Sequence, residues 1–429
     1  MSPDLHLNEL GTHLVELSVG EAEFLLRTQQ GHLDLRPERA SLDSGRGPWL
    51  ATVGPVCGVI ALPSGRRVYI DPKARVANVW HMLAYHWDVL ELGELMSRNE
   101  GAGGLLQGMM VAYVRELCRL VDRGLVPGWP ERKQWLPAMR GGLDLLAQLR
   151  AHPASRHRFA CVFREMGLDT LEHRVLLAAL EIVRLGLDRT PELVAAIRRC
   201  RRALSGVSLA PVGERELRAL RAPPGAEHYR TALALARLLL GHCAAGHRPG
   251  ATSAPSLIVQ MPRLFERFVC GMLARGLPLH LQVRQAGHSV PLDEERRVLL
   301  APDAVIERGG MPVCVLDAKY KTTGGPGRGR EVSAEDVYQM LAYCVGYQTT
   351  EAVLVYPEPC ATLPLHIRCG AKASTRPWTV RVQALGLDLS ADRGQVRREC
   401  DALCRRVAEI AEGAAGSVSI ARLHGVEPD

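Results

Sequence analysis

An acidic residue two positions before a lysine occurs three times in this chain, and this spacing can bring a carboxylate beside an ammonium group. The three instances are Asp71 to Lys73, Glu131 to Lys133 and Asp317 to Lys319. Residues two apart project to the same face of a β-strand, so such a pair needs a strand to become a site. Only Asp317 and Lys319 follow an apolar run, residues 313–316, that is typical of a buried strand. This instance is therefore the candidate reaction centre.

A second carboxylate, Asp303, lies fourteen residues before Asp317, on a strand that precedes it. If the turn between the two strands comprises three residues, 309–311, Asp303 falls directly opposite Asp317. A two-residue turn places it opposite Leu316 instead, so the alignment depends on the turn. The chain contains 5 lysines and 48 arginines, which indicates that residue 319 is lysine for its amine rather than only for its charge.

Two carboxylates and a lysine at one point have the composition needed to hydrolyse a phosphodiester. Mg²⁺ prefers carboxylate oxygens and keeps several water ligands. A bound cation can neutralise phosphate oxygens and activate water, and a nearby ammonium can orient that water. We therefore expect Asp303 and Asp317 to bind Mg²⁺, with Mn²⁺ as an alternative, and Lys319 to act on the attacking water.

Three further polar residues lie on predicted helices around this pair. Gln339 and Tyr343 are four residues apart and share a helix face, so both can point at the site. Glu266 lies on an earlier helix and can complete a metal shell as a third carboxylate. Taken singly, each of the three is better explained as an ordinary polar residue on a helix surface. Their order along the chain is what makes them candidates.

These residues require a sheet flanked by helices. Apolar periodicity and turn signals predict the following elements: a helix over 261–273, strands over 279–284, 297–307 and 311–319, a helix from the N-cap Ser333 to about 346, and a strand over 351–356. Gly309 and Gly310 join the second and third strands. The order is helix, strand, strand, strand, helix, strand.

The rest of the chain divides into regions of different pattern. Residues 1–80 are β-rich, with a hairpin around Ser64 and Gly65, and residues 103–245 read as a string of helices. The Gly- and Pro-rich segment 246–255 marks the main boundary. We predict an α+β multidomain protein with a β-rich, partner-binding N-terminal region over 1–80, a helical middle domain over 81–250, a domain carrying the site over 251–385 and a helical tail over 386–429.

Composition limits the class of protein. With 429 residues, 47% apolar and 23% charged, the chain is a globular protein of several domains. It has no apolar run long enough to span a bilayer and no signal-peptide pattern, so we expect a cytoplasmic protein. The net charge is +7, and residues 130–222 hold 17 basic and 10 acidic groups. The run Arg198, Arg199, Arg201, Arg202 fits a polyanionic partner or a solvated helix C-terminus equally well.

The twelve cysteines are scattered and form no C-x-x-C pair. Cys400 and Cys404 can share a helix face, and with Cys360 and Cys369 they could form a four-thiolate metal or iron–sulfur site. Buried unpaired cysteine is the commoner situation in an intracellular chain, so we do not expect this cluster.

The ordered set Glu266, Pro302-Asp303, Asp317-Ala318-Lys319 and Gln339-x-x-x-Tyr343 resembles the motifs of the PD-(D/E)xK nuclease superfamily. The surrounding text, MPRLFERFV, LLAPDAVI, VLDAKYK and DVYQMLAY, resembles the McrC subunit family of modification-dependent restriction systems. The upstream block VYIDPKARVANVWHMLAY and the segments over 135–150 and 159–180 resemble the same family. The resemblance covers roughly residues 55–385.

This resemblance implies a PD-(D/E)xK nuclease core with a mixed sheet, and a catalytic set of Asp303, Asp317, Lys319, Gln339 and Tyr343. It also implies a Mg²⁺-dependent endonuclease subunit that acts on methylated double-stranded DNA beside an McrB-like AAA+ GTPase. The chain has no G-x-x-x-x-G-K-[ST] loop, so we expect it to bind no nucleotide itself. Lys321, Arg328 and Arg330, in and beside a Gly/Arg-rich loop, are candidate DNA contacts.

Two other functions fit the same sequence. The chain could act as a non-catalytic activator and adaptor of an AAA+ ring, although every candidate catalytic position holds a suitable residue type. It could also be a RecB-like repair nuclease, which would degrade DNA from ends without any need for methylation. The upstream blocks favour the restriction subunit over this repair nuclease.

Overall fold

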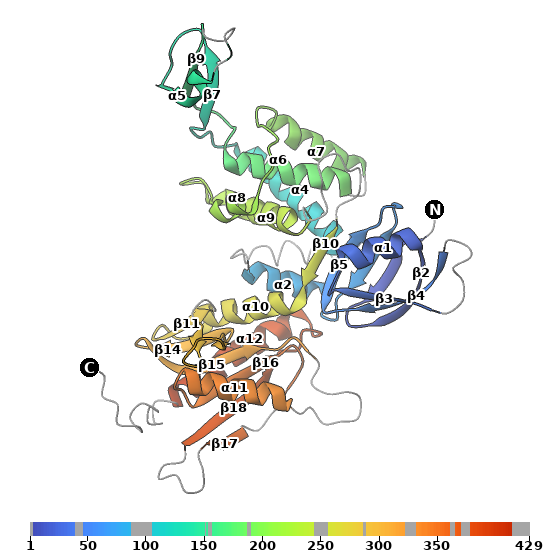
Figure 1. The fold of residues 1–429 in the computed structure, drawn as a ribbon, viewed down its shortest axis with the longest axis vertical. Coiled ribbons are helices and arrows are strands. Elements are labelled where there is room, and N and C mark those ends of the chain that lie inside the picture. Colours follow the sequence, from blue (N-terminus) through green and yellow to red (C-terminus); the bar gives the residue numbers. More distant parts are fainter. Residues whose placement is uncertain are drawn as a thin grey trace. The chain divides into compact units, whose positions relative to one another are not determined.

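The computed structural model describes residues 3–38, 46–86, 105–150, 152, 157–186, 190–243, 256–285, 289–321, 332–360, 365–369 and 378–413 (Figure 1). The chain is a mixed α+β protein with several sheets, as predicted. It divides into two compact units. The first comprises residues 1–4, 58–68 and 98–258, and the second comprises residues 5–57, 69–97 and 259–429. The division into the four predicted domains stays a prediction.

The first unit is built mainly from helices whose apolar faces pack together. Its helices are α4 (Leu105–Arg123), α6 (Leu171–Gly186), α7 (Pro191–Ala203), α8 (Glu214–Ala219) and α9 (Arg230–Cys243), with the short η3 (Glu227–Tyr229). Helix α4 contacts α6, α7 and α9. His173, fully buried on α6, bonds Tyr229 Oη at 3.0 Å, which satisfies a polar group inside this bundle.

The expectation of a string of helices over 103–245 misses a small β-lobe over residues 131–164, which stands between α4 and α6 in the chain (Figure 1). Strands β7 (Glu131–Leu136), β9 (Phe159–Arg164) and β8 (Gly142–Leu143) form an antiparallel sheet with α5 (Leu145–Leu149) beside it. Strand β7 has charged and exposed positions through most of its length. It lacks the alternation that predicts a strand, so its pairing with β9 could not be seen locally.

The N-terminal residues form two sheets, as the β-rich pattern predicts. One has the order β2-β4-β3 (Thr12–Ser18, Arg46–Val53, Leu33–Pro37) and is accompanied by α1 (Val19–Thr28). The other has the order β1-β6-β5-β10 (Leu5–Asn8, Arg67–Asp71, Val56–Ala61, Leu257–Gln260). Strands β5 and β6 are the predicted hairpin, and helix α2 (Val76–His86) follows them. A Cβ at Gly58 would lie 1.9 Å from Leu257 O, so the approach of β10 to β5 requires glycine there.

The C-terminal sheet of the second unit has the order β11-β14-β15-β16-β18-β17. Its strands are Leu281–Gln285, Ala304–Arg308, Met311–Ala318, Glu351–Tyr356, Trp378–Gly386 and Leu365–Cys369. Strand β15 pairs antiparallel with β14 and parallel with β16. Helices α11 (Ala334–Gly346), α10 (Met261–Gly276) and α12 (Arg393–Gly413) pack on it. The predicted order of helix, three strands, helix and strand is confirmed as α10, β11, β14, β15, α11 and β16.

Two details of this sheet differ from the predictions. The expected single strand over 297–307 is broken at 301–303, because Leu299–Leu300 (β13) pairs with Val290–Pro291 (β12) in a separate hairpin. Strands β17 and β18 were not predicted, although β18 is central to the sheet. The break matters for function, since it leaves Asp303 just outside the regular ladder.

No helix within the described ranges is both long and apolar enough to cross a membrane.

Candidate active site at the ends of strands β14 and β15

A β-bulge decides where Asp303 lies. The turn between β14 and β15 has two residues, since Arg308 pairs with Met311 and Glu307 with Pro312. This turn alone would have placed Asp303 opposite Leu316. The register then shifts between Ile306 and Glu307, so that Ile306 pairs with Cys314 and Ala304 with Leu316. One more step along this register brings Asp303 opposite Asp317, and the Ala318 N–H donates to Asp303 Oδ2 at 2.7 Å.

The two carboxylates are held together at some electrostatic cost. Asp317 is buried, with 4% of its surface exposed, and Asp303 is half-buried. Burial, followed by the negative charge of Asp317, raises the pKa of Asp303 to about 7, against the Ala318 N–H bond, which lowers it. Two acidic groups that cannot both ionise easily are a ready acceptor for a divalent cation, because the cation removes their repulsion.

Lys319 is fixed by a directed chain of hydrogen bonds. Its ammonium lies 2.6 Å from Asp317 Oδ2 and donates to Gln339 Oε1 at 2.7 Å. The Gln339 amide donates from Nε2 to Tyr343 Oη at 2.7 Å, and Tyr343 donates to the Ala301 carbonyl at 3.3 Å. The Gln339 oxygen accepts from Lys319 and the Gln339 NH₂ group donates to Tyr343. The orientation of the amide and the position of the amine are therefore set together.

Gln339 and Tyr343 therefore face the site rather than solvent. Helix α11 begins at the predicted N-cap Ser333, whose Oγ accepts from the Asp336 N–H at 3.2 Å. This start, together with burial of Met340 and Tyr343, sets the rotation of the helix. Burial, followed by the charge of Asp317, raises the pKa of Tyr343 to about 12, so its hydroxyl stays a proton donor. The reading of these two residues as ordinary surface polarity is wrong.

Glu266 lies close enough to interact electrostatically with Asp303 and Asp317. Burial raises the pKa of Glu266, and Asp317 raises it further, while Arg267 and Arg263 lower it. Within the described ranges, no three His, Cys, Asp or Glu side chains are already arranged to hold a metal ion. Asp303 and Asp317 fit a hard cation by their chemistry and mutual repulsion, whereas Glu266 as a third ligand stays a prediction.

The other predicted site residues have different surroundings. Lys321 pairs with Asp336 Oδ2 at 2.7 Å, and Arg328 and Arg330 lie outside the described residues. The three as DNA contacts stay a prediction. Cys400 and Cys404 are buried on α12, where Cys404 Sγ contacts the Met272 carbonyl at 3.9 Å. Cys360 packs against the core below α11, and the side chain of Cys369 lies outside the description.

In the two remaining instances of the acid–lysine spacing, the lysine forms an ion pair with a glutamate. Glu131 and Lys133 are exposed on β7 and lie 4.0 Å apart. Lys73 forms an ion pair with Glu358. In the basic run of α7, Arg201 pairs with Glu181 at 2.9 Å and Arg199 pairs with Asp122, which favours the helix-surface reading for these two arginines.

Two interactions beside the site were missed by sequence reasoning. Lys321, Asp336 and Tyr356 form one cluster, with Tyr356 Oη donating to Asp336 Oδ2 at 2.8 Å. Tyr320 donates to Glu9 at 3.2 Å across 311 positions of sequence. Nothing local in the sequence indicates these partners for Asp336 or for Glu9.

Comparison with known structures agrees with this architecture. A chain of the Thermococcus gammatolerans assembly of McrB AAA+ hexamers with bound McrC matches with a TM-score of 0.56 and 17% identity. The match covers 94% of this chain and 100% of that chain, and shows a shared fold. A chain of the T. gammatolerans McrBC complex matches with a TM-score of 0.43 and 16% identity, over 66% of this chain and 89% of that one. No curated protein matches.

The family model described as "McrBC 5-methylcytosine restriction system component" matches residues 51–357. This range includes the strands that carry Asp303, Asp317 and Lys319, and α11 with Gln339 and Tyr343. Since the match spans well over half of the sequence, the chain belongs to the family of McrBC 5-methylcytosine restriction system components.

Proposed function

We propose that this chain is the Mg²⁺-dependent DNA endonuclease subunit of a GTP-driven, methylation-dependent restriction complex, with a PD-(D/E)xK nuclease core. The observation that carries the proposal is the convergence of Asp303, Asp317 and Lys319 at the ends of two paired strands. Membership of the McrBC family supports the restriction role. The element order from α10 to β16 supports the nuclease core.

The reaction would add water to the DNA phosphorus and break one P–O ester bond. A bound Mg²⁺ would supply charge neutralisation of the phosphate and a more acidic water. Asp303 and Asp317 would hold it, with Glu266 as a further carboxylate nearby. Two protons of the Lys319 ammonium are used by Asp317 and Gln339 among the described residues, and the third can hydrogen-bond the attacking water. Gln339 and Tyr343 keep the amine in that position.

Reconstitution tests this proposal against its two alternatives. The chain is combined with a McrB-type AAA+ GTPase from the same organism, GTP, Mg²⁺, and either methylated or unmethylated closed-circular DNA. We expect double-strand breaks only with GTP and methylation together. Degradation that requires free ends and ignores methylation would indicate a repair nuclease. Faster GTP hydrolysis with intact DNA under both Mg²⁺ and Mn²⁺ would indicate a non-catalytic activator.

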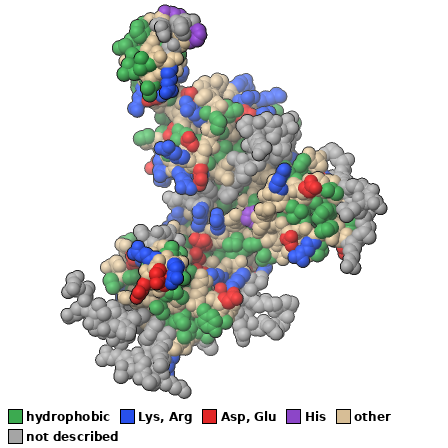
Figure 2. Space-filling view, viewed as in Figure 1, with side chains coloured by type: hydrophobic (Ala, Val, Ile, Leu, Met, Phe, Trp, Pro, Cys, Tyr) green, Lys and Arg blue, Asp and Glu red, His purple; other side chains and the backbone are tan. Residues whose placement is uncertain are grey.

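The β-lobe, taken here with its flanking residues 128–130 and 165–167, supports an AAA+ protein partner. Its exposed large apolar side chains are Trp129, Met139, Leu145, Leu146, Leu149 and Met166, each with more than 60% of its surface accessible. Figure 2 shows apolar side chains gathered on this lobe. Apolar side chains at this density on one small lobe are typical of an interaction surface. We propose that the lobe contributes to binding the AAA+ ring, whose counterpart is present in the T. gammatolerans assembly.

Replacing both Leu146 and Leu149 of the lobe by glutamate should weaken binding of the AAA+ partner by about tenfold or more, because the charges oppose burial of this surface. Leu146 is 67% and Leu149 81% exposed, so the fold should tolerate the change. Binding is measured by titrating labelled chain with the partner and GTP. Leu209→Glu, at a 62% exposed position outside the lobe, is the matched control. Equal affinity for the double variant and the control would remove the lobe from the interface.

A further inference from the structure

Tyr320 lies between two lysines whose side chains have different partners. The Lys319 N–H donates to the Val355 carbonyl at 2.8 Å, which keeps the strand end paired with β16. The Lys321 N–H then donates to the Lys319 carbonyl at 3.0 Å, which closes a tight turn around Tyr320. Lys319 reaches Asp317 and Lys321 reaches Asp336. This one turn therefore joins the backbone that carries the Lys319 amine to the backbone that carries Lys321.

The phenol of Tyr320 is held by Glu9, from the N-terminal part of the same unit. Tyr320 Oη donates to Glu9 Oε2 at 3.2 Å, and the Lys73 N–H donates to the same oxygen at 2.9 Å. Glu9 is only 6% exposed, and its N–H donates to the Asp71 carbonyl at 2.9 Å. Glu9 is thus hydrogen-bonded to the end of strand β6 and the residues that follow it, through both its backbone and its carboxylate. It is an anchor that cannot follow Tyr320 if the turn moves.

The ring of Tyr320 also contacts helix α10. Its centroid lies 5.8 Å from that of Phe265, which is fully buried and directly precedes Glu266 on α10. Helix α10 is itself tied to the N-terminal part, since the Met261 N–H donates to the Pro55 carbonyl at 3.1 Å. One side chain therefore contacts both the strand that ends in Lys319 and the helix that carries Glu266.

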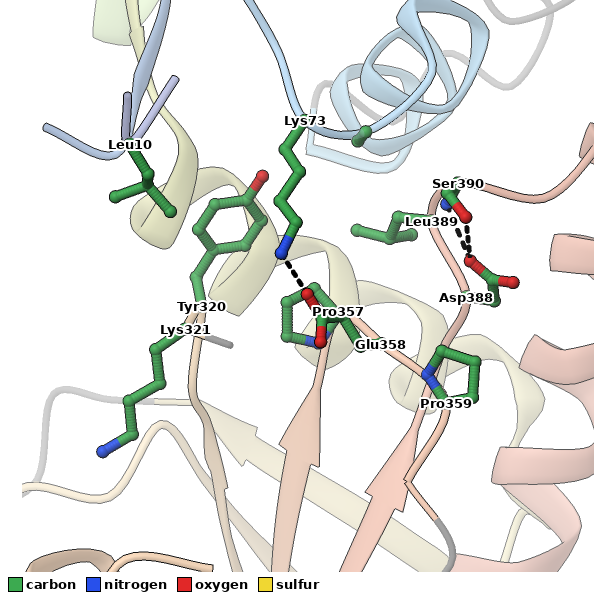
Figure 3. A pocket seen from close by; sticks show the side chains of 11 residues that line it. Leu10, Lys73, Tyr320, Lys321, Pro357, Glu358, Pro359, Asp388, Leu389 and Ser390 are labelled. Carbon is green, nitrogen blue, oxygen red and sulfur yellow. Dashed lines mark hydrogen bonds and ion pairs between the residues drawn. The ribbon is translucent and has the colours of Figure 1, made fainter. Parts of the chain in front are cut away.

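The Tyr320 ring is closely packed on some sides only. Tyr320 lines a cavity of about 310 Å³, together with Lys73, Glu358 and Leu389. Figure 3 shows the phenol pointing towards the segments of Leu10 and Lys73, while the Lys321 side chain points the other way. Because open space lies beside the ring, the hydrogen bond to Glu9 and the contact with Phe265 decide its position.

We propose that Tyr320 is a positioning residue for the reaction and that Glu9 is its anchor. The pair would fix the turn 319–321 so that the amine stays between Asp317 and Gln339. This rests on the proposed function, because the amine matters only if Lys319 acts on the attacking water. Loss of the Glu9–Tyr320 hydrogen bond would leave the carboxylates in place and let the amine move. Small misplacements of a catalytic group can cost one to two orders of magnitude in rate.

The test is a double-mutant cycle in the reconstituted complex, with Tyr320→Phe, Glu9→Leu and the combined variant. We expect kcat for DNA cleavage to fall about tenfold in each, with KM for DNA within about twofold of wild type. The combined variant should lose no more than either single one, because both remove the same hydrogen bond. Glu9→Gln keeps an acceptor oxygen and should restore most of what Glu9→Leu loses. Tyr338→Phe, at a 69% exposed site on α11, is the matched control.

A second readout needs no nuclease activity. Reductive methylation at limiting reagent, quantified by mass spectrometry, reports how freely each lysine reacts. Tyr320→Phe should raise the rate at Lys319 about threefold or more, measured against the exposed Lys133, because the amine leaves its two partners. Unchanged kcat together with an unchanged Lys319 rate would overturn the proposal, and so would additive losses in the cycle. If the wild-type chain cleaves no DNA, the proposed function fails, while the methylation rates still decide whether Glu9 and Tyr320 position Lys319.

Discussion

Replacing Lys319 by arginine should lower DNA cleavage by about 100-fold or more while leaving Mg²⁺ affinity within about threefold of wild type. Arginine keeps the positive charge, so the ion pair with Asp317 can survive. Its guanidinium is larger, planar and bound to its protons at every working pH, so it cannot occupy the place of a compact amine between Asp317 and Gln339. A loss of 100-fold corresponds to about 2.7 kcal/mol of transition-state stabilisation.

Cleavage rates under saturating Mg²⁺ and GTP, together with calorimetric metal titrations, check this prediction. Lys133→Arg is the matched control, because Lys133 is exposed on β7. If Lys319→Arg cleaves within twofold of wild type, charge alone is sufficient at this position. The reaction would then not require an amine at residue 319.

Replacing Asp303 by asparagine should have opposite effects on stability and on metal binding. In metal-free protein at pH 8 it should raise the thermal midpoint by a few degrees, because it removes the cost of burying this charge and, second, its repulsion with Asp317. The asparagine Oδ1 can still accept the Ala318 N–H. The stabilisation that Mg²⁺ gives to the wild type should disappear, because one of the two charged ligands is gone.

The sign of the pH dependence follows from the raised pKa of Asp303, about 7 against an ordinary value of 3.8. Between these values the folded wild type holds a proton that the unfolded chain releases, so stability falls as pH rises through this window. The gain from Asp303→Asn should therefore be largest above pH 7 and smaller at pH 5. Asp34→Asn, at an exposed ion pair, is the control. A gain that is the same at pH 5 and pH 8 would contradict the assigned cause.

The sequence predicts the sheet that carries the site because its strands and helices are strongly apolar. Strand β16 is buried at every position, and α10 buries one face along its whole length, so their patterns are unambiguous. The opposition of Asp303 and Asp317 could be stated only as a condition on the turn. The turn has two residues, and the bulge near Ile306 restores the alignment that a three-residue turn would have given. Pleat alternation contains no signal for such a bulge.

The β-lobe and the Glu9–Tyr320 hydrogen bond are two further features that the sequence does not predict. Strand β7 is polar and exposed, and pairing with β9 rather than burial defines it. Glu9 and Tyr320 lie 311 positions apart in the sequence and meet only in the folded second unit. Long-range contacts of this kind depend on tertiary packing, which a single sequence without local periodicity cannot specify.

The most direct test of the central claim is cleavage of methylated closed-circular DNA by the reconstituted complex with Asp317→Ala in place of wild type. Asp317 is buried and pairs with Lys319, so its loss removes the proposed metal ligand and the partner of the amine. We predict that double-strand breaks fall below detection while the variant still binds the AAA+ partner and stimulates GTP hydrolysis as the wild type does. Breaks at the wild-type rate would show that the reaction takes place elsewhere.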